Sequence, residues 1–149
     1  MKPISVTFQG FGPYLERQTV DFRSVARNGL FLIRGETGAG KTTILDAICC
    51  ALYGQSSNGD KAGQPGRGGL EAMRCRSAPP DAETLVEFIF EQDGLVYTFR
   101  CRLWPNRRGN LNEEEKCSVR GPDGAETVLA SKKTEVWRKA AEIIGLEAE

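Results

Sequence analysis

The sequence predicts an α/β fold in which a glycine-rich loop joins a strand to a helix. Residues 30–34, LFLIR, form a short apolar run of the kind seen in strands buried on both faces. Residues 35–40 form the glycine-rich loop, and residues 41–53 repeat apolar side chains at helical spacing. Gly54 stands where a glycine ends many helices. The predicted architecture is a central sheet with this helix against it, joined to an antiparallel β portion further along the chain.

Two strands are predicted before the glycine-rich loop. Ile4, Val6 and Phe8 alternate with polar residues, as they do in a half-buried strand. The segment GFGPY at residues 10–14 interrupts this alternation with two glycines and a proline. Residues 19–22 are predicted to form the second strand.

A β-hairpin is predicted in the second half of the chain. Its two β-rich runs, residues 84–91 and 95–104, are joined by QDG at residues 92–94, and an Asp-Gly pair favours a tight hairpin turn. Residues 55–69 and 105–115 are polar segments without periodicity, so both are predicted to be mobile loops.

A weaker strand pair and a helix complete the predicted elements. Residues 116–120 and 126–130 have strand-like composition and are separated by a Gly-Pro-Asp-Gly turn. Ser131 is a candidate N-cap for a helix that ends near Gly145.

The composition limits the classes of protein that fit. A chain of 149 residues with 40% hydrophobic residues can bury one ordinary core, so residues 1–149 are treated as one unit. Twenty basic and twenty acidic residues leave no net charge, so nucleic acid could be held only by a local basic patch. Five cysteines without histidine argue against a zinc site or a disulfide framework. With no long apolar run and no signal peptide, the expectation is a cytoplasmic protein without a membrane partner.

The glycine-rich loop carries a complete phosphate-binding pattern. G-x-x-x-x-G-K-[ST] is matched by Gly35, Gly40, Lys41 and Thr42. Glycines let the backbone approach phosphate oxygens without a Cβ clash, and the helix N-terminus adds unpaired N–H groups with partial positive charge. Lys41 is predicted to reach the β- and γ-phosphates as the catalytic residue, and the Thr42 hydroxyl to coordinate Mg²⁺.

The predicted cofactors are ATP and Mg²⁺. The predicted nucleotide contacts come from the loop and the first helical turn: Gly35, Glu36, Thr37, Gly38, Ala39, Gly40, Lys41, Thr42 and Thr43.

A P-loop hydrolase also needs an acidic residue at the end of a second buried strand. The run VEFIFEQD imitates this arrangement with Glu91 and Asp93, but a hairpin turn explains the same residues more simply. The chain is therefore expected to lack a catalytic carboxylate of its own.

Four stretches resemble the N-terminal ATPase segment of the SbcC family, the large subunits of SbcC–SbcD DNA nucleases and relatives of the structural-maintenance-of-chromosomes proteins. MKPISVTFQGFGPY resembles the opening strand and loop of that family, and NGLFLIRGETGAGKTTILDAICCALYG its strand, P-loop and helix. VEFIFEQDGLVYTFRCR resembles the following hairpin, and SKKTEVWRKAAEIIGL the helix before the Q-loop. The resemblance implies an ABC-type, SMC-like P-loop ATPase head, of which residues 1–149 would be the N-terminal part.

The resemblance also implies a mechanism and partners. ATP and Mg²⁺ would lie between two heads, each site completed by the C-terminal half of a head, which supplies the signature motif and the Walker B carboxylates after a long coiled coil. ATP binding and hydrolysis would gate the access of an SbcD-like nuclease subunit to double-stranded DNA ends or hairpins in repair and recombination, in the cytoplasm at the nucleoid. The chain is expected to be a fragment that is inactive alone. Arg74 matches an arginine common in SbcC-like sequences and is a further candidate contact to the nucleotide; a solvated surface arginine is the alternative interpretation.

Two alternatives remain open. Arg100, Arg102, Arg107 and Arg108 cluster around the end of the predicted hairpin and could follow a DNA backbone, or they could simply be solvated. The other alternative is an unrelated small nucleotide or metabolite kinase of the P-loop type, with residues 55–76 as its lid.

Overall fold

The computed structural model describes residues 1–25, 31–57 and 69–145. It contains six strands and two helices within those residues: β1 (Lys2–Gln9), β2 (Gln18–Asp21), α1 (Lys41–Tyr53), β3 (Thr84–Gln92), β4 (Leu95–Pro105), β5 (Leu111–Arg120), β6 (Glu126–Ala130) and α2 (Lys133–Ile144).

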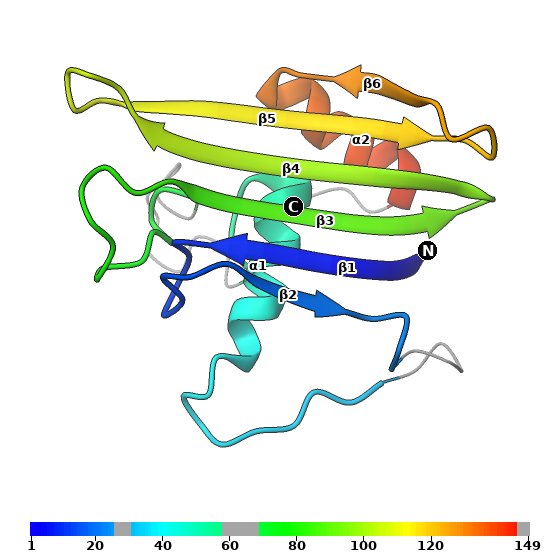
Figure 1. Ribbon diagram of the computed structural model, residues 1–149. Coiled ribbons are helices and arrows are strands. Elements are labelled where there is room, and N and C mark those ends of the chain that lie inside the picture. Colours follow the sequence, from blue (N-terminus) through cyan, green and yellow to red (C-terminus); the bar gives the residue numbers. More distant parts are fainter. Residues whose placement is uncertain (26–30, 58–68, 146–149) are drawn as a thin grey trace.

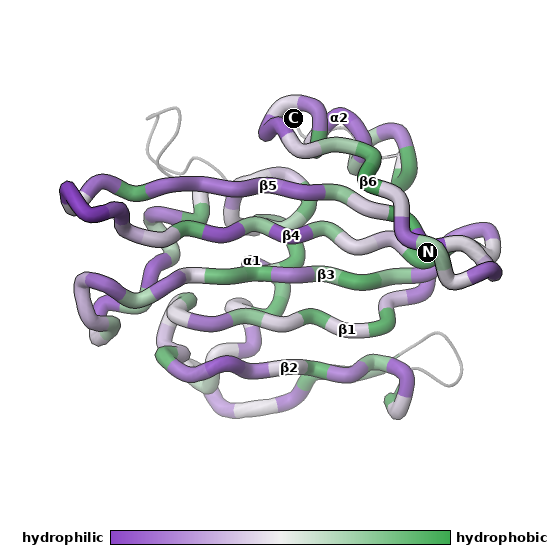
Figure 2. The backbone as a smooth tube through the Cα atoms, turned by 45° about the horizontal axis from the view of Figure 1, so that its top comes forward, coloured by the Kyte–Doolittle hydropathy of each residue, from purple (hydrophilic) through white to green (hydrophobic). Residues whose placement is uncertain are grey.

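All six strands form one antiparallel sheet in the order β2-β1-β3-β4-β5-β6. Both helices lie on the same face of this sheet, with α1 behind the β1, β3 and β4 strands and α2 behind β5 and β6 (Figure 1). The hydropathy of the strands follows this arrangement, since β3 in the middle of the sheet is largely hydrophobic and β5 is mainly hydrophilic (Figure 2). The predicted α/β class is confirmed, but the β portion is a single sheet rather than two parts.

The core lies between the sheet and α1. Alternate side chains of the central strands point toward the helix, as the period of two in a strand requires. Val6, Phe88 and Phe99 on three neighbouring strands are at most 1% exposed, and Ala47 and Cys50 meet them from α1 with no exposed surface. Burial of this face fixes the position of α1 on the sheet.

The predicted hairpin is confirmed. The two strands pair from Thr84↔Leu103 to Gln92↔Leu95. Asp93 and Gly94 both have positive φ, 54° and 78°, which is the conformation that a two-residue hairpin turn requires. The predicted strands at 19–22, 116–120 and 126–130 are also present, within one residue or as parts of longer strands.

The buried strand predicted at residues 30–34 is wrong for residues 31–34, and residue 30 lies outside the described residues. Residues 31–34 form no strand, and Leu32 is 86% exposed. Phe31 is 37% exposed and packs on the ring of Phe22, with centroids 5.1 Å apart. An apolar run becomes a strand only when neighbouring strands satisfy its backbone and cover its side chains, and within the described residues the sheet offers none to this segment.

The mobile loop predicted at residues 105–115 is also wrong for most of its length. β4 continues to Pro105, and β5 begins at Leu111. The short turn between them is closed by Asn106, whose side-chain oxygen accepts bonds from the backbone N–H groups of Arg108 and Asn110. The polar sequence misled the prediction because it does not show that Glu114 lies beside Arg102 on the uncovered face while Glu115 is buried beside Lys133 of α2.

Two further predictions concern the start of α2 and the loop at residues 55–69. α2 begins at Lys133 with Lys132 as its N-cap, so Ser131 does not cap the helix. The first helical hydrogen bond runs from the Val136 N–H to the Lys132 carbonyl, and no side chain caps this end. In the loop predicted at 55–69, residues 58–68 lie outside the described residues.

A buried polar cluster joins α2 to the sheet. Glu115 of β5 is 5% exposed, and its carboxylate lies 3.8 Å from the Cys101 Sγ and 4.0 Å from the Lys133 Nζ. Lys133 also lies 2.9 Å from the Glu113 carboxylate. Cys101, Glu113 and Glu115 place three possible metal-ligand atoms within 4.8 Å of one another, but the ammonium of Lys133 already supplies the positive charge there. Burial raises the pKa of Glu115 to about 7.

The raised pKa of Glu115 predicts a loss of stability with rising pH. An ordinary glutamate pKa of 4.5 in the unfolded chain and about 7 in the folded chain means that the folded state holds the proton more tightly. The stability that Glu115 contributes is therefore complete below pH 4.5 and is lost as the pH rises to about 7, by about 3 kcal/mol at most. Glu115→Gln should be more stable than the unchanged chain at pH 8 and similar to it near pH 5, as measured by urea unfolding.

Glu135→Gln is the matched control, since Glu135 carries the same charge on α2 but its side chain is 42% exposed and lies near Lys132 rather than near Glu115. It should leave the pH dependence of unfolding almost unchanged. An identical pH dependence for Glu115→Gln and the unchanged chain would contradict the prediction.

Candidate nucleotide-binding site

The glycine-rich loop is open to solvent. Residues 35–39 are exposed, and α1 begins at Lys41 directly after them. Gly38 and Gly40 adopt positive φ, 86° and 81°, so two of the three glycines have the conformation that only glycine takes easily. Gly35 has no such conformation, and a Cβ there would lie 3.4 Å from the Ala39 side chain, which is about an ordinary contact distance.

The ammonium of Lys41 lies within the loop. Its Nζ donates to the carbonyl oxygens of Gly35 at 2.7 Å and of Glu36 at 2.5 Å. The loop thus surrounds the lysine ammonium, and the outer surface of the loop is exposed to solvent. An anion that entered the loop could replace these carbonyls as the acceptor of the ammonium, because charged acceptors bind an ammonium more strongly.

Thr42 and Thr43 face different surroundings at the start of α1. Thr42 is exposed beside the loop, whereas Thr43 is 8% exposed. Gly12 lies against Thr43, since a Cβ on Gly12 would be 3.0 Å from the threonine methyl carbon. Of the two threonines, Thr42 is therefore the one accessible from solvent.

The segment after β1 covers the base of the loop. The Tyr14 hydroxyl donates to the Ala39 carbonyl at 3.4 Å, and a Cβ on Gly40 would lie 2.4 Å from that hydroxyl oxygen. Gly40 must therefore be glycine for space as well as for backbone conformation. The glycines and proline of GFGPY predict a break in the strand, but their spacing could not show that the tyrosine meets the glycine-rich loop.

Arg74 lies beside the same segment but is engaged with the sheet. Its Nη2 donates to the Ala82 carbonyl at 3.2 Å and its Nε to the Thr84 hydroxyl at 3.4 Å. Its backbone forms a β-bridge with Phe11. These contacts explain why an arginine stands here, and a contact with a nucleotide stays a prediction.

An open pocket of about 430 Å³ adjoins this part of the site. It is bounded on one side by Gly12 and Pro13 and on the other by residues 72–77. Because Gly12 also contacts Thr43, the pocket lies next to the start of α1. The loop and the pocket therefore both adjoin the start of α1.

Asp46 ties the chain after α1 back to the helix. It is 5% exposed, and one carboxylate oxygen accepts hydrogen bonds from the Ser57 backbone N–H at 2.9 Å and its hydroxyl at 2.6 Å. This buried carboxylate is therefore occupied in holding residues 55–57. Sequence reasoning did not single it out, since one aspartate in a helical pattern is usually solvated.

The acidic residues of the hairpin lie far from the loop. Lys2 pairs with Glu91 and Gln9 with Leu85, so the turn at Asp93 is at the opposite end of the sheet from Gly10 and the segment that touches the loop. Glu91 and Asp93 cannot serve a nucleotide at the glycine-rich loop from this position. The hairpin interpretation of VEFIFEQD is confirmed.

The class of protein to which this fold belongs is given by comparison with known families. The AAA domain family matches residues 5–136, and the chain belongs to this family. The predicted resemblance to SbcC is confirmed by curated relatives that are named as the SbcC component of the nuclease SbcCD. The relative from Vibrio cholerae is 36% identical over 154 residues, which cover 99% of this chain and 14% of the relative. The relative from Staphylococcus saprophyticus is 51% identical over 113 residues, 76% of this chain and 10% of the relative.

The chain thus spans less than one sixth of the length of these relatives. The small-kinase alternative is not favoured by this similarity. Within the described residues, neither helix has the length and apolar character needed to cross a membrane.

Proposed function

We propose that residues 1–149 are the N-terminal ATP-binding part of a split ATPase head in an SbcC-like subunit of a DNA nuclease complex. The observation that carries the proposal is the exposed glycine-rich loop, closed around Lys41 and placed at the start of α1. The similarity to SbcC subunits along 99% of the chain supports the same function. ATP binding and hydrolysis would then control the access of a nuclease subunit to double-stranded DNA ends or hairpins.

The residues of the loop fit a triphosphate. Gly38 and Gly40 carry no side chain into the exposed loop, and the α1 N-terminus presents backbone N–H groups beside it. Lys41 would exchange the Gly35 and Glu36 carbonyls for β- and γ-phosphate oxygens. Mg²⁺, held by the exposed Thr42 hydroxyl, would supply charge neutralisation of the phosphates.

Hydrolysis would need residues from a second segment. Glu91 and Asp93 are at the far end of the sheet, and Asp46 is buried against Ser57. Leu32, 86% exposed, and Leu45 of α1, 52% exposed, leave apolar surface on the segment before the loop and on the helix after it. Exposed apolar side chains at these places favour a covering partner. The proposed partner is the C-terminal half of the head, which would pair with residues 31–34 and bring the missing acid.

Binding of ATP should depend on Lys41. Lys41→Ala should weaken Mg-ATP binding by about tenfold or more, because a charge-assisted hydrogen bond to phosphate is lost. Equilibrium dialysis with labelled ATP measures the change directly. Lys132→Ala is the control, since Lys132 is a surface lysine with a side chain 79% exposed beside the other helix. Equal affinities for the two variants would contradict the proposed role of Lys41.

Hydrolysis should depend on a second segment. The chain with Mg-ATP should release phosphate no faster than buffer, because the acids of the hairpin lie at the far end of the sheet and Asp46 is engaged by Ser57. Addition of the C-terminal half of an SbcC head should raise phosphate release, and Lys41→Ala should abolish the rise. Rapid turnover by the chain alone would overturn the split-site proposal.

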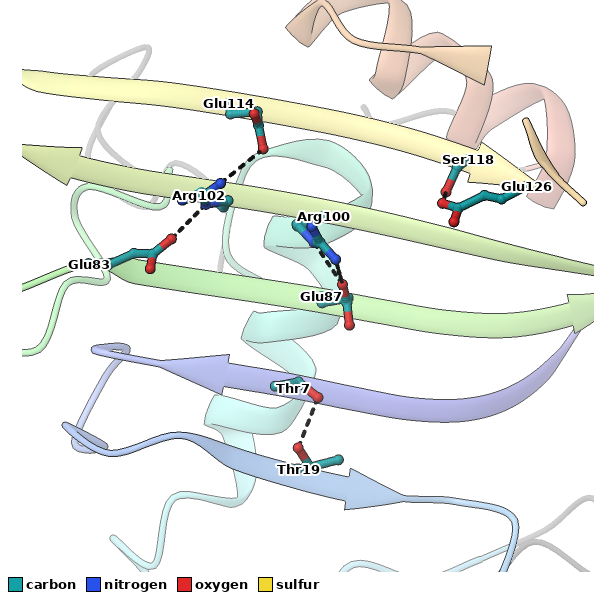
Figure 3. Close-up of polar contacts among 9 residues, drawn as sticks. All are labelled: Thr7, Thr19, Glu83, Glu87, Arg100, Arg102, Glu114, Ser118 and Glu126. Atoms are coloured by element: carbon teal, nitrogen blue, oxygen red, sulfur yellow. Dashed lines mark hydrogen bonds and ion pairs between the residues drawn. The ribbon is translucent and has the colours of Figure 1, made fainter. Parts of the chain in front are cut away.

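A second proposed role is contact with DNA at the β4–β5 turn. On the uncovered face of the sheet, Arg100 pairs with Glu87 at 2.6 Å, and Arg102 lies between Glu83 and Glu114 (Figure 3). Those two arginines are therefore neutralised by the sheet itself.

Arg107 and Arg108 in the turn differ from the arginines of the sheet. Within the described residues neither forms an ion pair, and the nearby acids are committed elsewhere, since Glu113 pairs with Lys133 and Glu114 with Arg102. The turn therefore projects two uncompensated positive charges, which suits a phosphate backbone.

The salt dependence of DNA binding tests this role. Replacing both Arg107 and Arg108 by alanine should reduce the slope of log affinity against log salt by roughly two, since each phosphate contact contributes about 0.9. Fluorescence anisotropy with a labelled duplex gives the slope. The double variant Arg138→Ala/Lys139→Ala removes the same charge from α2 and should leave the slope unchanged. Equal slopes for all three proteins would exclude a contact by the turn.

A further inference from the structure

The turn that follows β1 is fixed to the rest of the protein by backbone hydrogen bonds. Within residues 10–15, the Phe11 N–H donates to the Tyr14 carbonyl at 2.9 Å and the Tyr14 N–H to the Phe11 carbonyl at 3.0 Å. The Gly12 N–H donates to the Met73 carbonyl at 2.7 Å, and the Phe11 side chain has no exposed surface. The position of Tyr14 is therefore set by the sheet and its core rather than by the glycine-rich loop.

The Tyr14 side chain lies between the core and the glycine-rich loop. Its ring packs on Phe8 of β1, with centroids 5.2 Å apart, and Phe8 is 2% exposed. A Cβ on Gly40 would lie 2.4 Å from the Tyr14 hydroxyl oxygen and 3.1 Å from its Cζ, so the hydroxyl end of the ring lies directly against the loop. The tyrosine thus connects a fixed part of the protein to a loop that has few other contacts.

The Tyr14 hydroxyl selects one orientation of the peptide group between Ala39 and Gly40. It donates to the Ala39 carbonyl at 3.4 Å. In a planar trans peptide the C=O and the N–H point in opposite directions, so the Gly40 N–H points away from the tyrosine. The Ala39 N–H is already bonded to the Glu36 carbonyl at 3.1 Å, whereas the Gly40 N–H donates to no acceptor among the described residues. The Gly40 N–H is therefore available to a ligand.

We propose that Tyr14 is a positioning residue for phosphate binding, which keeps the Gly40 N–H directed toward a phosphate oxygen and the Ala39 carbonyl directed away from it. A glycine adopts either sign of φ at little cost, so the loop residues alone would allow this peptide group to flip. The flipped peptide would present a carbonyl oxygen to the anion in place of a donor. This inference rests on the proposed binding of ATP by the loop, and it adds to that site a residue from outside the glycine-rich pattern.

Removal of the Tyr14 hydroxyl should weaken nucleotide binding. Tyr14→Phe keeps the ring in place but loses the donor to the Ala39 carbonyl, so the affinity for Mg-ATP should fall by about fivefold, as for the loss of one hydrogen bond. Equilibrium dialysis with labelled ATP measures the change. Tyr97→Phe is the matched control, since Tyr97 of β4 stacks on Phe90 near the hairpin turn, at the other end of the sheet. It should bind Mg-ATP as the unchanged chain does.

The NMR signal of the Gly40 N–H separates positioning from a general effect on the loop. Gly40 and Gly63 are the two glycines that follow an alanine in the sequence, so labelling of alanine carbonyl carbon and glycine nitrogen isolates their amide signals. Gly63→Ala then identifies the signal that comes from Gly40. A hydrogen bond to a charged acceptor deshields an amide proton. Saturating Mg-ATP should therefore move the Gly40 signal downfield in the unchanged chain and in Tyr97→Phe, and clearly less far in Tyr14→Phe.

The carbonyl carbon of Ala39 tests the contact without nucleotide. Its resonance should move upfield in Tyr14→Phe, because the carbonyl loses a hydrogen-bond donor, and should not move in Tyr97→Phe. Equal Mg-ATP affinities for the two variants, with equal shifts of the Gly40 signal, would overturn the positioning role and leave the proposed function standing. A weaker affinity of Tyr14→Phe with an undiminished Gly40 shift would also overturn the positioning role. Absence of Mg-ATP binding to the unchanged chain would overturn both proposals.

Discussion

The packing of α1 against the sheet is the interaction on which the rest of the structure depends. Ala47 and Cys50 have no exposed surface beneath the phenylalanines of β3 and β4, and this contact sets the axis of the helix. The position of the helix then determines where its N-terminus opens toward solvent and where its C-terminus meets α2. The glycine-rich loop has few contacts of its own, chiefly with Tyr14. The position of the loop is therefore determined by the helix that follows it.

A one-sided sheet explains how the two faces of the molecule differ. The covered face uses large apolar side chains at alternate positions, while the other face pairs side chains across strands, as Arg100 does with Glu87 and Thr7 with Thr19 at 3.0 Å (Figure 3). Such cross-strand pairs each add only a little stability, so the fold depends on the covered face. The uncovered face is left polar, and Arg107 and Arg108 in the turn beside it form no ion pair among the described residues.

Sequence reasoning succeeded where local chemistry decides the structure. Asp93-Gly94 specified a tight turn, Gly54 a helix end and Lys41 a helix start, because each depends on backbone conformation within a few residues. It failed where distant contacts decide. Residues 30–34 read as a buried strand because apolar runs imply neighbours, and polar residues 111–115 read as a loop because the sequence does not state which face of a sheet meets water. The proximity of Tyr14 to Gly40, which lie far apart along the chain, carried no sequence signal at all.

The exposed segment at residues 31–34 directly precedes the glycine-rich loop. Leu32 belongs to the most strand-like apolar run of the chain, yet it is the most exposed large hydrophobic residue among those described. The strand-like pattern of residues 31–34 therefore disagrees with their exposed surroundings, and these residues adjoin the loop for which a second segment is proposed to supply the catalytic acid. A second segment that paired with residues 31–34 would satisfy their backbone, cover Leu32 and approach the loop from the open side. A single second segment would then supply both the missing strand neighbour of residues 31–34 and the missing carboxylate.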